Sequence, residues 1–220
     1  MIPDTQTLQT ARHQMIQQQL RCGEVLDDRI LRAISDIPRE MFVGPKFQGV
    51  AYADTEIPLP CGELMWPPLL EGRCLQALEL QPADRVLEVG TGSGYLTACL
   101  SQLGGQVSSI DIHTQLVELA QPRLEHLHIG NCELRTADVY DFDAGQYDAI
   151  VVTGSIPKPD PRFERWLRPG GRLFVIVGKE PLMEAWLIRR VADTHWNRHA
   201  LFETSTPPLI HAPEPPAFLF

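Results

Sequence analysis

The sequence lacks several features that mark whole classes of protein. It has no apolar run near the roughly 18 residues that a membrane-spanning helix needs. Its first residues are polar, without the basic and apolar regions of a signal peptide. Basic residues are in deficit, because 19 Lys and Arg against 28 Asp and Glu give a formal net charge of −9. Nucleic-acid backbones bind basic surfaces. We therefore expect a cytoplasmic protein that uses neither a membrane nor nucleic acid as its partner.

Cysteine is sparse, and the histidines are scattered. The five cysteines are an odd number, are spread along the chain, and form no Cys-x-x-Cys. That pattern favours reduced thiols over a disulfide framework. The seven histidines show no metal-ligand spacing. Even His126 and His128, two residues apart, would point away from each other on a helix. We expect no metal site.

The second part of the chain alternates between two patterns. Short runs rich in β-branched residues predict strands, and amphipathic windows between them predict helices. The expected strands are 85–89, 106–110, 133–137, 147–153 and 172–178, and the clearest helices are 95–103 and 114–127. Such alternation predicts a mostly parallel sheet covered by helices on both faces. Two later runs, 186–191 and 200–206, have only a loop-sized gap between them and predict an antiparallel hairpin at the sheet edge.

The first 80 residues follow a different pattern. Apolar stripes predict a helix over about 5–22, a short one from Asp28 to Pro38, and a third over about 67–79. Residues 38–72 are rich in Pro and Gly and have no sustained period, which predicts an ordered loop that covers a functional site.

No repeat or low-complexity linker divides the chain. We expect residues 1–220 to form a single domain, with helices and a substrate lid in 1–80 and a cofactor-binding α/β core in 81–220. The tail, 207–220, holds five prolines. It predicts an extended packed arm, with a partner-binding peptide as the alternative.

A glycine-rich turn follows the first predicted strand of the core. Residues 90–94 read Gly-Thr-Gly-Ser-Gly, between a buried strand and a helix. Glycines at alternate positions permit a sharp turn and a close approach of a ligand to the backbone. The turn lies at the carboxyl end of a strand, where open α/β sheets bind ligands. The dinucleotide fingerprint is Gly-x-Gly-x-x-Gly, so the spacing argues against a nicotinamide cofactor.

Three acidic residues indicate the chemistry of the ligand. Glu88, just before the turn, would repel a pyrophosphate but suits a ligand with sulfonium and ammonium groups. Asp111 ends the second strand, where an acid can bind ribose hydroxyls. Asp138 follows the third strand and is placed to meet an adenine amino group. The combination predicts S-adenosylmethionine; the alternatives are a turn that binds nothing and acids that cap helices. The predicted cofactor-binding residues are Glu88, Gly90, Thr91, Gly92, Ser93, Gly94, Asp111, Ile112, Asp138 and Val139.

Further motifs lie along nearly the whole chain. They are Ile-Pro-Arg-Glu-Met-Phe-Val at 37–43, Ala-Tyr-Ala-Asp at 51–54 with Ile-Pro-Leu-Pro at 57–60, Val-Leu-Glu-Val-Gly-Thr-Gly-Ser-Gly-Tyr at 86–95, Tyr-Asp-Ala-Ile-Val-Val-Thr at 147–153, Leu-Arg-Pro-Gly-Gly-Arg-Leu at 167–173, and a loosened Phe-x-Pro-Leu from Phe202 to Leu209. Together they resemble the motifs of the protein-L-isoaspartate O-methyltransferase family.

The resemblance implies a class I methyltransferase fold, which is a Rossmann-like, mostly parallel seven-stranded sheet with an N-terminal helical layer. It also implies methyl transfer from S-adenosylmethionine to the α-carboxylate of an L-isoaspartyl residue in a damaged protein or peptide. The ester closes to a succinimide, which reopens partly to normal aspartate. A carboxylate is already a competent nucleophile, so the enzyme mainly has to align it with the methyl group and remove its water.

The resemblance breaks in the covering loop. The family reads Gly-Gln-Thr-Ile-Ser-x-Pro, and its Ser or Thr contacts the reacting carboxylate; residues 62–68 here read Gly-Glu-Leu-Met-Trp-Pro-Pro. Trp66 therefore stands at the hydroxyl position, and an indole cannot replace a compact hydroxyl. Glu63 adds negative charge where a carboxylate should bind, which is unfavourable unless Glu63 is paired or points away. A second departure is Gly154-Ser155, where the family usually has Ala-Ala.

The candidate catalytic residues are Asp54 and Trp66. By resemblance, Asp54 belongs to the loop that closes over the site, with an ordinary turn acid as the alternative. Trp66 either fills the old pocket, forms a stacking platform for another acceptor, or is a core tryptophan. Two other functions stay open: a methyltransferase with a different protein or small-molecule acceptor, and a protein that binds S-adenosylmethionine without transferring the methyl group.

Overall fold

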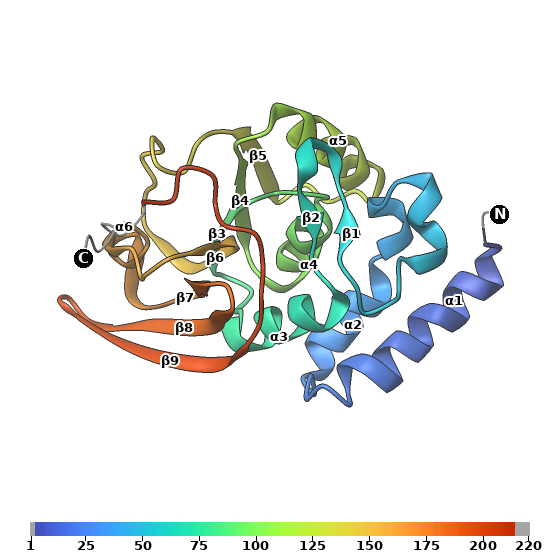
Figure 1. The fold of residues 1–220 in the computed structure, drawn as a ribbon, viewed down its shortest axis with the longest axis horizontal. Coiled ribbons are helices and arrows are strands. Elements are labelled where there is room, and N and C mark those ends of the chain that lie inside the picture. The colour runs from blue at the N-terminus through green and yellow to red at the C-terminus, as the bar shows by residue number, and fades with distance from the viewer. Residues whose placement is uncertain (1–2, 214–220) are drawn as a thin grey trace.

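A seven-stranded sheet lies at the centre of the computed structural model, which describes residues 3–213 (Figure 1). The strand order is β5-β4-β3-β6-β7-β8-β9. The strands are β3 (Arg85–Val89), β4 (Gln106–Asp111), β5 (Cys132–Thr136), β6 (Tyr147–Ile156), β7 (Leu167–Lys179), β8 (Leu182–Ala192) and β9 (His195–Glu203). Strands β5, β4, β3, β6 and β7 pair in parallel, whereas β7–β8 and β8–β9 are antiparallel. The predicted parallel sheet and the predicted edge hairpin are both confirmed.

Both faces of the sheet are buried. Along β3, Val86 packs into one apolar cluster and Leu87 into another, because successive side chains point to opposite faces. The first cluster includes side chains of α2 (Asp28–Asp36), α3 (Pro68–Leu78) and α4 (Tyr95–Leu103). The second packs under α6 (Pro161–Arg165), a short helix that the sequence analysis did not identify. Helix α5 (Thr114–His126) connects β4 to β5.

The N-terminal helices form a layer against α3 and α4. Helix α1 (Thr5–Gln14) runs directly into a π-helical segment, Met15–Leu20, whose Met15 and Leu20 side chains are fully buried. The carboxylate of Asp27 accepts a hydrogen bond from Arg29 N and caps α2. The three helices predicted in the first 80 residues are all present. The expected N-terminal helical layer is confirmed.

The segment between α2 and α3 is ordered, as predicted for a covering loop. It contains three 3-10 turns, Arg39–Phe42, Pro45–Val50 and Pro60–Gly62, and a small antiparallel pair, β1 (Ile57–Pro58) and β2 (Leu64–Met65). The β1–β2 pair stands over the carboxyl end of the central sheet (Figure 1). We call residues 54–67 the lid.

The chain returns across the same end of the sheet after β9 (Figure 1). We call residues 204–213 the C-terminal strap. Ser155 N donates to Pro207 O at 2.9 Å, and Leu209 N donates to Ser155 O at 2.9 Å. The prediction of a packed arm is thus confirmed for 207–213; residues 214–220 lie outside the described part of the chain. Gly154 makes this packing possible, because a Cβ there would lie 2.8 Å from the Leu209 side chain.

All five cysteines are free thiols, two of them buried. Between residues 3 and 213, no helix is long and apolar enough to cross a membrane.

Candidate cofactor and acceptor site

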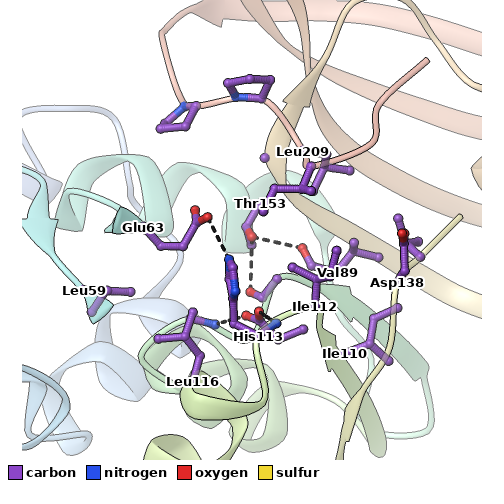
Figure 2. A pocket seen from close by; sticks show the side chains of 18 of the residues that line it. Leu59, Glu63, Val89, Ile110, Ile112, His113, Leu116, Asp138, Thr153 and Leu209 are labelled. Carbon is purple, nitrogen blue, oxygen red and sulfur yellow. Dashed lines mark hydrogen bonds and ion pairs between the residues drawn. The ribbon is translucent and has the colours of Figure 1, made fainter. Parts of the chain in front are cut away.

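A cavity of about 90 Å³ opens at the carboxyl ends of β3, β4 and β6 (Figure 2). This is where the strand order reverses, since β4 and β6 lie on opposite sides of β3, and such a point is the usual ligand site of an open α/β sheet. Leu59, Glu63 and Leu64 of the lid form one side of this cavity, and residues 206–210 of the strap form another. The predicted cofactor residues on its wall are Gly90, Gly92, Asp111, Ile112, Asp138 and Val139.

The glycine turn is shaped by close backbone contacts. Gly90 N donates to Ile110 O at 2.7 Å, and Gly90 has a φ of +98°. A Cβ at Gly90 would lie 2.0 Å from Thr153 Oγ1, which itself hydrogen-bonds Val89 O at 2.9 Å. Glycine is therefore required at this position on both conformational and steric grounds.

Two backbone amides fix the Asp111 carboxylate at the cavity wall. Gly92 N donates to Oδ2 and His113 N to Oδ1, each at 2.9 Å. The carboxylate thus connects the glycine turn to the end of β4. Ile112, the next residue, lines the cavity beside it.

Asp138 lies across the cavity from Asp111, after β5. Its Oδ1 accepts from Tyr140 N at 2.9 Å, and its Oδ2 lies 2.5 Å from Nδ1 of His211 in the strap. Partial burial opposes ionisation, but these contacts and the nearby charges of His211 and Arg162 hold the pKa of Asp138 below its usual value. The carboxylate is ionised at neutral pH, with both oxygens already engaged.

The other predicted cofactor residues lie behind the cavity wall. The Glu88 side chain is fully buried, and its Oε2 accepts hydrogen bonds from Thr97 and Ser109. Burial raises the pKa of Glu88 to about 8 despite these donors, so the carboxyl is protonated at neutral pH. Thr91 and Ser93 border a small adjoining hollow, and Gly94 packs against Ala120. None of these four lines the main cavity in the described structure.

A contact that the sequence analysis missed crosses the cavity mouth. His113 Nε2 lies 3.2 Å from Glu63 Oε1, and both side chains line the cavity (Figure 2). Glu63 is therefore within hydrogen-bond distance of His113, a contact that neutralises its charge only when the imidazole is protonated. Its position in a family motif drew attention to Glu63, but nothing in the sequence indicated His113 as its partner.

Trp66 is buried in the core rather than displayed as a platform. Only 5% of it is exposed, and its ring meets Phe174 edge-on with 6.2 Å between centroids. Its Nε1 donates to Thr206 Oγ1 of the strap at 3.0 Å, and its carbonyl oxygen accepts a hydrogen bond from buried Arg39. Trp66 also borders the small hollow behind the glycine turn.

Asp54 is exposed and does not line this cavity. Its Oδ1 accepts a hydrogen bond from Leu69 N at 3.1 Å, in the first turn of α3. This contact joins the start of the lid to α3, and the catalytic role of Asp54 stays a prediction.

A second, larger cavity of about 640 Å³ lies on the other side of the strap. Leu64 and residues 206–209 form a wall that the two cavities share. Ser155, Lys179 and His211 are among the polar residues on its surface. For the part of the chain that is described, no group of three His, Cys, Asp or Glu side chains could hold a metal ion.

Comparison with known proteins agrees with this geometry. The family model for protein-L-isoaspartate(D-aspartate) O-methyltransferase matches residues 10–210. A protein-L-isoaspartate O-methyltransferase of Koribacter versatilis is 38% identical over 192 residues, 86% of each chain. One of Aeropyrum pernix is 33% identical over 213 residues, 94% of this chain and 82% of that one. A solved structure of a Plasmodium falciparum protein described as such an enzyme, in complex with S-adenosyl-L-homocysteine, has a TM-score of 0.79 at 19% identity. The match covers 92% of this chain and 98% of that one. It confirms the class I methyltransferase fold. The chain belongs to the protein-L-isoaspartate O-methyltransferase family.

Proposed function

We propose that this protein is an S-adenosylmethionine-dependent O-methyltransferase that methylates the α-carboxylate of L-isoaspartyl residues in damaged proteins or peptides. The observation that carries the proposal is the family match over residues 10–210, which contains both the glycine turn and Asp111 on one cavity wall. Five unpaired cysteines favour a reducing compartment and support the cytoplasm as its location.

The residues on the cavity wall suit S-adenosylmethionine in their chemistry. The backbone of Gly90 and Gly92 would face the methionine part, since no side chain stands between it and the cavity. Asp111 would hold the ribose hydroxyls. Ile112 and Val139 would flank the adenine, and Asp138 would accept from its amino group. The bound cofactor supplies an electrophilic methyl group on a sulfonium sulfur.

Glu88 would act from behind the turn and not as a counter-charge. Its carboxyl is buried, which raises its pKa to about 8, and its contacts with Thr97 and Ser109 hold α4 and β4 around the glycine turn. The sulfonium would instead be stabilised by oriented backbone carbonyls and by the nearby carboxyl group of Asp111.

The lid and the strap must move when the cofactor enters. Small-molecule sites enclose roughly 300–1,000 Å³, well above the 90 Å³ of this cavity. Two exposed contacts lie at the cavity mouth, Glu63 with His113 and Asp138 with His211, and all four side chains are at least partly accessible. Opening at these two contacts leaves the buried contact between Trp66 and Thr206 in place.

The second cavity is the proposed entry for the acceptor. It meets the cofactor cavity along Leu64 and the strap, so a carboxylate that enters here would reach the methyl group. The hydroxyls of Ser155 and Ser205 lie on its wall, together with two basic side chains, Lys179 and His211, and two acidic ones, Glu56 and Glu180. Because the carboxylate needs no general base, the protein has to position it and exclude water.

One observation favours a different acceptor. Trp66 stands where the family motif has a hydroxyl, and it is packed into the core. The second candidate function is therefore methyl transfer to another protein or small molecule.

The test is transfer of labelled methyl from S-adenosylmethionine to an isoaspartyl peptide, with the matching aspartyl peptide as control. Calorimetric titration of S-adenosylhomocysteine measures cofactor-site binding independently. We expect selective methylation of the isoaspartyl peptide. Cofactor-site binding without methylation would exclude this acceptor and favour the second candidate or a non-catalytic binding role.

A further inference from the structure

Trp66 contacts a hydroxyl group of the strap. By resemblance, Trp66 stands at the hydroxyl position of the lid motif. Its Nε1 donates to Thr206 Oγ1 at 3.0 Å. At this place the structure therefore has a hydroxyl group that comes from the strap and not from the lid.

Thr206 lies where the two cavities meet. It belongs to the wall of the cofactor cavity and to that of the second cavity, and it is 4% exposed. Its carbonyl oxygen accepts from Ser155 Oγ at 3.1 Å, and the next carbonyl, of Pro207, accepts from Ser155 N. The backbone of Thr206 is therefore held against the end of β6.

The hydroxyl of Thr206 has a proton to donate. Trp66 uses one of its lone pairs and so orients the O–H bond away from the indole. The proton is directed to Thr153 O over 3.5 Å, beyond the usual range of about 2.5–3.0 Å for O–H···O hydrogen bonds. Buried polar groups are normally hydrogen-bonded at good geometry. A better acceptor that enters the junction would thus attract this proton.

We propose that Thr206 Oγ1 donates a hydrogen bond to the acceptor carboxylate, in place of the hydroxyl that the lid lacks, and that Trp66 is the positioning residue that orients it. This proposal rests on the proposed function. The bond is made to the carboxylate oxygen that does not attack, because a donor on the attacking oxygen would withdraw electron density from it. Thr206 thereby fixes the orientation of the nucleophile at the cavity junction.

The test compares Thr206→Val, which removes the hydroxyl and keeps the shape, with Thr206→Ser, which keeps the hydroxyl. For each we measure kcat and KM on an isoaspartyl peptide, and calorimetric binding of that peptide to protein saturated with S-adenosylhomocysteine. We expect Thr206→Val to weaken peptide binding and lower kcat/KM by on the order of 10- to 100-fold, as for loss of a hydrogen bond to a charged group. S-adenosylhomocysteine binding changes by less than about 2-fold, and Thr206→Ser remains within about 3-fold of the wild type.

Trp66→Phe provides an independent test, because it removes the N–H and keeps a ring against Phe174. We expect a smaller loss, about 3- to 10-fold in kcat/KM, with Thr206 present but unoriented. This variant decides the question if Thr206→Val does not fold. If Thr206→Val, or Trp66→Phe, binds the peptide as tightly as the wild type and has the same kcat/KM, the proposal is overturned. A wild-type protein that does not methylate isoaspartyl peptides removes the proposed function and, with it, this role of Thr206.

Discussion

The Glu63 carboxylate lies 3.2 Å from His113 Nε2, and this contact joins the lid to the loop after β4. The two side chains are 34% and 25% exposed. Pairs of this kind contribute roughly 0–1 kcal/mol, because solvent screens them. The contact is thus strong enough to favour the closed lid and weak enough to break when a ligand enters.

We predict that Glu63→Gln accelerates the association of S-adenosylhomocysteine by about 2- to 5-fold, since a neutral amide accepts a weaker hydrogen bond from His113 than a carboxylate does. Stopped-flow fluorescence measures the association rate. Glu118→Gln on α5 is the matched control, because Glu118 is exposed and its substitution changes the net charge by the same amount. An unchanged association rate in Glu63→Gln would mean that the pair does not restrain the lid.

Glu88 makes the stability of the protein depend on pH. Its carboxyl is fully buried, and burial raises its pKa from an ordinary value of 4.5 to about 8. The folded protein therefore holds a proton that the unfolded chain releases above pH 4.5. By linkage, the stabilisation from this group is complete below that pH and is lost as the pH rises toward 8.

We predict that Glu88→Gln removes this pH dependence. The amide stays neutral and can still accept hydrogen bonds from Thr97 and Ser109. Near pH 8.5 the variant should exceed the wild type by on the order of 2 kcal/mol or more in unfolding free energy, and at pH 5 the two should be similar. Urea unfolding at the two pH values measures the difference, with Glu203→Gln on exposed β9 as the control. Unfolding free energies of Glu88→Gln and the wild type that change in parallel with pH would contradict this prediction.

Local sequence pattern was sufficient to place the elements of the core. Strand β3 and helix α4 begin and end where predicted, because apolar periodicity and flanking glycines define both. Strand β7 begins at Leu167, five residues before its predicted start. Its first part contains Pro169 and Gly170, which are poor strand residues, and a register shift opposite β6 accommodates them. Helix α6 has only five residues, too few for a helical period.

The site was only partly predictable, for a physical reason. The positions of Gly90 and Asp111 on the cavity wall could be predicted, because a glycine turn and an acidic residue at a strand end are local features of the sequence. The Glu63–His113 and Trp66–Thr206 contacts join residues 50 and 140 positions apart. Contacts at such separations leave no periodicity in the sequence.

Arg39 is fully buried and holds the lid to the core. Its guanidinium contacts Glu71, donates to Ala51 O and to Trp66 O, and stacks over the Tyr95 ring at 4.7 Å. We predict that Arg39→Met destabilises the protein by about 3–5 kcal/mol, because it leaves the Glu71 carboxyl buried without its partner. The double variant Arg39→Met with Glu71→Leu should recover part of this loss. Chemical denaturation checks both, and equal stabilities of the single and double variants would refute the explanation.

The strap competes with the proposed cofactor contact at Asp138. Tyr140 N occupies Oδ1, and His211 Nδ1 lies 2.5 Å from Oδ2, so an adenine amino group has to share or displace one of them. His211 is the weaker competitor, because 64% of its side chain is exposed. Displacement of His211 would also loosen the hydrogen bond from Leu209 N to Ser155 O.

We predict that His211→Ala strengthens S-adenosylhomocysteine binding by about 2- to 5-fold, the size expected for loss of one exposed competing contact. Calorimetry measures the affinity, and His199→Ala on exposed β9 is the control. In the wild type, hydrogen exchange at the Leu209 amide should accelerate when S-adenosylhomocysteine binds, because the contact between His211 and Asp138 is lost and the strap loosens. Weaker binding by His211→Ala would show instead that His211 helps to assemble the cavity, and the adenine amino group would then need an acceptor other than Asp138 Oδ2.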